Sequence, residues 1–140
     1  MDQWALDVEN TRNQLADGQV LIVSVMGSPD ATNDPSLVIR QFAAAAERAC
    51  EAGADIVEVN LSCPNTGGQG VMCRDAAMSA RVVEAVRAKL SPSRTPLLIK
   101  ISYLEQPLLS DLLAQCANHI STAWSRSTPF QCLFTAAPGN

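Results

Sequence analysis

The residues best suited to chemistry lie together in the segment Glu58–Asn65, which reads EVNLSCPN. Asn60 and Asn65 carry neutral amides that donate and accept hydrogen bonds at once, which suits a planar ring bearing carbonyl and N–H groups. Between them, Cys63 carries a thiol that can exchange a proton with a substrate carbon. The segment therefore predicts a site for a planar ring, and the alternative interpretation is a polar loop around a buried cysteine.

The elements around this segment alternate between strands and helices. Apolar runs predict strands, and apolar residues at helical spacing behind Asp34, Asp75 and Pro107 predict helices. The predicted strands are Gln19–Met26, Asp55–Leu61 and Pro96–Ser102, and the predicted helices run from Asp34 to Gly53, from Asp75 to Leu90 and from Pro107 to His119. Met1–Gly18 reads as an amphipathic helix or a lead-in.

Three strand–helix units in series imply an α/β fold with a parallel sheet and helical crossovers. The sheet is either an open doubly wound sheet or part of a (β/α)₈ barrel. The first is disfavoured because no G-x-G-x-x-G follows a strand. Both folds place their sites at the carboxyl ends of the strands, where Glu58–Asn65 lies. In a barrel, some of the apolar strand residues would face the interior. The sequence leaves open which of these six do so: Val23, Val25, Val57, Val59, Leu98 and Ile99.

Composition excludes several function classes. The 140 residues carry a net charge of −4, and the ten basic residues, only two of them lysines, are scattered, so no nucleic-acid surface is expected. No apolar run has the length of about 20 residues that a membrane span needs, and the first residues lack a charged segment followed by an apolar stretch, so we expect neither a membrane span nor a secretory leader. The five cysteines are irregularly spaced and His119 has no partner at a metal-ligand spacing, so we expect reduced thiols, no metal and a cytoplasmic protein.

Three features together resemble one enzyme family: the string NLSCPN, the glycine-containing loop after it, and the strand PLLIKIS. They are similar to the FMN-dependent dihydroorotate dehydrogenases of the cysteine type and to the related pyrimidine-reducing domain of dihydropyrimidine dehydrogenase. The resemblance covers about residues 19–119. It implies a (β/α)₈ barrel, bound FMN and the oxidation of a small dihydropyrimidine, dihydroorotate to orotate.

The resemblance also implies roles for individual residues. Cys63 matches the catalytic base, and Asn60 and Asn65 match amides that hold the pyrimidine ring, Asn60 also lying near the flavin. Lys100 matches the lysine whose ammonium meets the pyrimidine edge of the flavin, and Ser24 falls where relatives carry a polar flavin contact. The alternative for Lys100 is a lysine that extends its ammonium from a strand end into water.

The chain departs from the family in length, because a complete (β/α)₈ barrel takes about 250 residues. The three units correspond to the third, fourth and fifth of the barrel. We therefore expect a partial barrel domain over residues 1–120 and an irregular tail over 121–140, in a fragment that is inactive when isolated. Two other functions stay open, uracil or thymine reduction and a non-catalytic degenerate barrel piece. A homo-oligomer or a second chain that completes the barrel is a further expectation.

Overall fold

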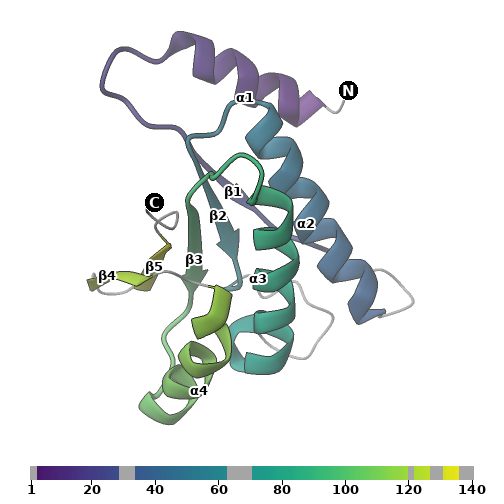
Figure 1. The fold of residues 1–140 in the computed structure, drawn as a ribbon, viewed down its shortest axis with the longest axis vertical. Helices are drawn as coiled ribbons and strands as arrows, with labels where there is room; N and C mark the ends of the chain where they lie inside the picture. Colours follow the sequence, from purple (N-terminus) through teal and green to yellow (C-terminus); the bar gives the residue numbers. More distant parts are fainter. Residues whose placement is uncertain (1–2, 29–33, 63–70, 120–121, 127–130, 136–140) are drawn as a thin grey trace.

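The computed structural model describes residues 3–28, 34–62, 71–119, 122–126 and 131–135. In these ranges the chain alternates between helices and strands as the sequence predicts (Figure 1). The elements are α1 (Gln3–Gln14), β1 (Ile22–Val25), α2 (Pro35–Glu51), β2 (Ile56–Asn60), the 3₁₀ turn η1 (Met72–Arg74), α3 (Ala76–Leu90), β3 (Leu97–Ile101), α4 (Gln106–Cys116), the 3₁₀ turn η2 (Ala117–His119), β4 (Thr122–Arg126) and β5 (Gln131–Thr135).

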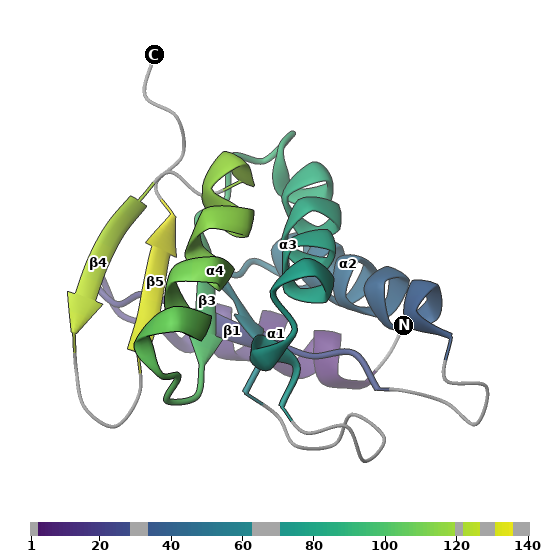
Figure 2. The same ribbon diagram turned by 90° about the horizontal axis from the view of Figure 1, so that it is seen from below.

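The five strands form one sheet in the order β1-β2-β3-β5-β4. Strands β1, β2 and β3 are parallel and consecutive, each joined to the next by a helix, so this part of the chain is a partial (β/α)₈ barrel. Helices α2, α3 and α4 lie along one face of the parallel strands (Figures 1 and 2). We call this the helix-covered face and the opposite one the inner face, since it corresponds to the interior of a barrel.

The helix-covered face holds the hydrophobic core. Side chains alternate between the two faces of a strand, so every second residue of β2 and β3 points at the helices. Those residues are almost completely buried: Val57, Val59, Leu61, Leu97, Ile99 and Ile101. The helices contribute residues that include Phe42, Val82, Val83, Val86 and Leu90. Of the six strand residues left open by the sequence, only Leu98 lies on the inner face. The other five face the helices: Val23, Val25, Val57, Val59 and Ile99.

Local signals in the sequence fix the ends of the first crossover helix. Asp34 caps α2 by accepting a hydrogen bond from the backbone N–H of Ser36 at 2.9 Å, and Pro35 takes the first helical position. Hydrogen bonds from Ser36 lower the pKa of Asp34 below its ordinary value. Beyond the other end, Gly53 has φ 97°, a conformation that favours glycine. The helix predicted from Asp34 to Gly53 is therefore confirmed.

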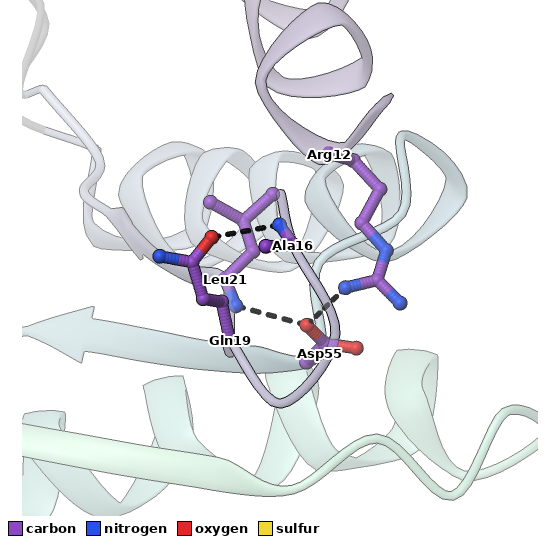
Figure 3. A network of polar contacts seen from close by, with 5 residues as sticks. All are labelled: Arg12, Ala16, Gln19, Leu21 and Asp55. Carbon is purple, nitrogen blue, oxygen red and sulfur yellow. Dashed lines mark hydrogen bonds and ion pairs between the residues drawn. The ribbon is translucent and has the colours of Figure 1, made fainter. Parts of the chain in front are cut away.

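A network of polar contacts connects the end of α1 and the loop after it to the start of β2 (Figure 3). The carboxylate of Asp55, the residue before β2, accepts a hydrogen bond from Arg12 Nη1 at 2.7 Å and another from the backbone N–H of Leu21 at 2.9 Å. Beside it, Gln19 Oε1 accepts from the backbone N–H of Ala16 at 2.8 Å. The loop between α1 and β1 is therefore bound to the start of the neighbouring strand.

The segment after residue 120 differs from the irregular tail expected from the sequence. Strand β5 pairs antiparallel with β3, and β4 pairs antiparallel with β5, so a hairpin forms one edge of the sheet (Figure 2). The strand forms because Cys132–Thr135 is a short run of strand-forming residues. The surrounding serines, threonines and prolines make the segment as a whole read as irregular. Pairing with this run satisfies the backbone groups along the free edge of β3.

Candidate active site

The inner face changes from apolar to polar along the strand direction. Near the amino ends, Ile22 and Ile56 are register partners on β1 and β2. One step further, Ser24 pairs with Glu58, and at the carboxyl end Asn60 pairs with Lys100 on β3. The polar groups therefore gather toward the end of the sheet where (β/α)₈ barrels carry out their chemistry.

One carboxylate joins all three parallel strands. Glu58 Oε1 accepts a hydrogen bond from the Ser24 hydroxyl at 2.7 Å and lies 3.3 Å from the ammonium nitrogen of Lys100. The side chains of Glu58 and Lys100 are only 14% and 26% exposed. Such a pair is less screened by water than one on the outer surface. We call Ser24, Glu58 and Lys100 the inner-face triad.

Asn60 closes strand β2 and begins the loop that follows it. Its side-chain oxygen Oδ1 accepts from both the backbone N–H and the hydroxyl of Ser62, at 3.1 and 2.7 Å. These bonds direct Oδ1 toward Ser62. Among the described residues no hydrogen bond involves Nδ2, so Nδ2 can donate to a ligand. Asn60 is held next to Lys100 because the backbone N–H of Leu61 donates to the carbonyl oxygen of Lys100 at 2.9 Å.

The chain returns to the end of β2 through the turn η1. The backbone N–H of Cys73 donates to the carbonyl oxygen of Leu61 at 3.1 Å, and the Cys73 thiol lies 3.1 Å from the Ser102 hydroxyl. Cys73 is 1% exposed and belongs to the hydrophobic core. It is a packing residue in this structure.

The structure brings together three of the five residues predicted for the site. Ser24, Asn60 and Lys100 lie on the inner face, although Ser24 gives its hydroxyl hydrogen to Glu58. The predicted base Cys63 and the second amide, Asn65, lie outside the described residues. Their roles remain predictions.

Sequence reasoning did not assign a role to Glu58, which is the centre of the triad. A signal for it exists in the string IVEVN, where a charged residue stands between two valines of a buried strand. Alternation places that residue on the face opposite the valines. A carboxylate there needs partners, because desolvating an isolated charge is costly.

Two further features are absent from the part of the chain that the structure describes. No three histidine, cysteine, aspartate or glutamate side chains in it lie close enough to hold a metal ion. Among the same residues, no helix has the length and apolar character needed to cross a bilayer.

Comparisons with known proteins agree with this architecture. Residues 1–123 match the family model described as dihydroorotate dehydrogenase. A dihydroorotate dehydrogenase of Dictyostelium discoideum is 30% identical to this chain over 118 residues, which is 84% of the chain and 31% of the relative. The chain thus spans about a third of the length of this relative. The match covers the three strand–helix units and the inner-face triad, and the chain belongs to the dihydroorotate dehydrogenase family.

Proposed function

We propose that this chain contributes the substrate- and flavin-facing residues of an FMN-dependent oxidoreductase that converts dihydroorotate to orotate. The observation that carries the proposal is the pairing of Lys100 with Asn60 at the carboxyl ends of β3 and β2, in a member of this family. An ammonium and an amide at that position offer a charge and a hydrogen-bond donor to one edge of a planar ring.

The donor set fits FMN. A flavin carries carbonyl oxygens and ring nitrogens along the pyrimidine edge of its ring system, where negative charge develops on reduction. Lys100 would hold that edge, because a half-buried ammonium stabilises developing negative charge more strongly than one in bulk water. Asn60 would donate from Nδ2 to the flavin or the substrate, since its Oδ1 is occupied by Ser62.

The reaction needs a base in addition to these groups. When bound, FMN supplies the acceptor for a hydride, that is, a hydrogen with its electron pair. We assign the base to Cys63, whose thiolate takes the proton from one saturated ring carbon while the hydride leaves the adjacent carbon. The ring thereby gains a carbon–carbon double bond and becomes orotate. Asn65 would hold the ring together with Asn60, and a second oxidant would then remove the two electrons from the flavin.

A segment exchange tests the proposal with this chain's own residues. The matched segment of the Dictyostelium relative is replaced by the corresponding residues of this chain, so that the relative supplies the other strands of the barrel. We expect the purified chimera to retain FMN. Dihydroorotate should then bleach the oxidised-flavin absorbance under anaerobic conditions, and Cys63→Ala should slow this bleaching by about 10²–10⁴-fold while FMN stays bound.

Two controls make the test specific. Dihydrouracil replaces dihydroorotate in one arm. Faster bleaching by dihydrouracil would indicate an enzyme of the uracil- or thymine-reducing type instead. Cys73→Ala serves as the matched cysteine variant, because Cys73 packs in the core and should leave the rate of flavin reduction nearly unchanged. A folded chimera that binds no FMN, or whose FMN dihydroorotate does not reduce, contradicts the proposal.

A further inference from the structure

The inner-face triad is built around a single oxygen atom. Ser24 on β1 and Lys100 on β3 both approach Glu58 Oε1, although the carboxylate has a second oxygen. Their strands flank β2 on either side, so the two contacts fix the carboxylate from opposite directions. A Glu side chain held at both sides has little freedom to rotate away from Lys100.

We infer that Glu58 is the positioning residue of Lys100, with Ser24 orienting Glu58 in turn. The inference rests on the proposed function in one respect, since the ammonium is positioned for the flavin only if a flavin binds there. Glu58 itself touches neither flavin nor substrate in this assignment. It holds the Lys100 ammonium on the inner face before any ligand arrives.

Flexibility explains why a lysine in this position needs such a partner. Its ammonium stands at the end of a four-carbon stem with several rotatable bonds, and water outside the sheet solvates the charge better than a half-buried face does. Without a carboxylate, the favoured conformation extends the ammonium into water. With Glu58 at 3.3 Å, the charge is stabilised on the inner face, next to Asn60.

The same geometry gives Ser24 a role in addition to the flavin contact, which stays a prediction. From the resemblance, Ser24 was expected to contact the flavin. In the structure its hydroxyl donates to Glu58 at 2.7 Å, so its one hydrogen is committed to the carboxylate. Ser24 therefore orients Glu58, while its oxygen can still accept a hydrogen bond from a ligand.

The chain offers an internal standard for a test that needs no flavin. It contains two lysines, and each is paired with one glutamate: Lys100 with Glu58 at 3.3 Å, and Lys89 with Glu47 at 3.0 Å. The Lys89–Glu47 pair lies on the outer surface, on helices α3 and α2. Trace acetylation of the full chain at fixed pH, followed by peptide mass spectrometry, gives the ratio of the Lys100 rate to the Lys89 rate.

Removing the carboxylate should release Lys100 selectively. An amine reacts only when the reagent reaches it, and the contact with Glu58 holds the Lys100 side chain half-buried on the inner face, so Glu58→Gln should raise the Lys100:Lys89 ratio about fivefold. Ser24→Ala should raise it about twofold, because the carboxylate loses one of its two anchors. Glu58→Asp keeps the charge and should restore much of the protection. The matched control Glu47→Gln should act on Lys89 instead and lower the ratio.

Each outcome bears on the inference. A ratio that Glu58→Gln leaves unchanged, or that Glu58→Asp raises as much as Glu58→Gln does, overturns the positioning role. If Glu58→Gln unfolds the chain, circular dichroism reports it, and Ser24→Ala decides instead: an unchanged ratio in that folded variant overturns the inference. Failure of the proposed function shows in the chimera as absent or unreactive FMN, and the labelling ratio does not depend on it.

Discussion

The two faces of the parallel sheet use the same strands for opposite purposes. On the helix-covered face, Val59 and Ile99 are buried among apolar helix residues, so this face stabilises the fold by hydrophobic burial. On the inner face, the residues next to them in sequence, Glu58 and Lys100, form an ion pair that burial makes more costly. Period-two alternation thus separates the apolar core from the polar groups of the proposed site within strands of five residues.

A second contrast lies along the direction of the strands. Asp55 at the amino end of β2 and Glu58 within it each form an ion pair with one cation and accept a hydrogen bond from one neutral donor. The Arg12–Asp55 pair is 43% and 33% exposed and connects α1 to the sheet, so water screens it. The inner-face pair is less exposed and lies toward the end expected to carry chemistry. Similar polar contacts therefore attach α1 to the sheet at the amino ends of the strands and form part of the proposed site nearer the carboxyl ends.

The largest expected effect on stability comes from the helix-covered face. Ile99→Ala removes a core side chain that is 2% exposed, and we expect the free energy of unfolding in urea to fall by about 2–5 kcal/mol. Tyr103→Ala is the control, because Tyr103 is 75% exposed and its loss should change stability by no more than about 0.5 kcal/mol. Equal effects of the two substitutions would break the distinction between core and surface.

Alkaline pH should weaken the same covered face through Cys116 at the end of α4. Burial raises the pKa of this thiol from 9.0 to about 11. Between these values the unfolded chain has lost the proton that the folded chain keeps, so stability falls as pH rises. The protonated thiol contributes about 3 kcal/mol to the free energy of unfolding below pH 9, and this contribution is lost as the pH rises through 11. Urea midpoints at pH 8 and 11 should show a smaller decline in Cys116→Ala than in the parent chain.

On the inner face, removing one charge should lower the free energy of unfolding more than removing both charges of the ion pair. Glu58→Met leaves the Lys100 ammonium half-buried without its carboxylate, and we expect a loss of about 1–2 kcal/mol. The double variant Glu58→Met with Lys100→Met removes both charges and should be within about 1 kcal/mol of the parent chain. A double variant that loses the sum of the two single losses would argue against direct coupling, and denaturant titrations of all four proteins measure it.

The smallest expected effect belongs to the amino-end attachment. Arg12→Met removes an exposed ion pair but leaves the backbone N–H of Leu21 bonded to Asp55, so we expect a loss of about 0.2–1 kcal/mol. In 1 M salt the parent chain and the variant should have nearly the same urea midpoint, because screening removes most of the pair's energy. A loss from Arg12→Met larger than that from Glu58→Met would reverse the comparison.

Local sequence determined the elements and the ends of several of them. Asp34 and Asp75 cap α2 and α3 as predicted, because a cap depends on the backbone groups within three residues. Gly53 adopts positive φ for the same kind of local reason. The parallel order of three strand–helix units and the placement of Asn60 at a strand end also follow from pattern alone. The family follows from that motif and is confirmed by the comparisons.

Only the tertiary structure decided which side chains meet. The contact from Ser24 to Glu58, the pairing of Glu58 with Lys100, and the attachment of Arg12 to Asp55 each join residues far apart in the sequence. They depend on strand register and on where a helix crosses the sheet, and a one-residue shift in register would have turned Glu58 toward the helices. The antiparallel hairpin on β3 was likewise missed, since a strand pairs with whichever edge is free and local composition carries no record of that edge.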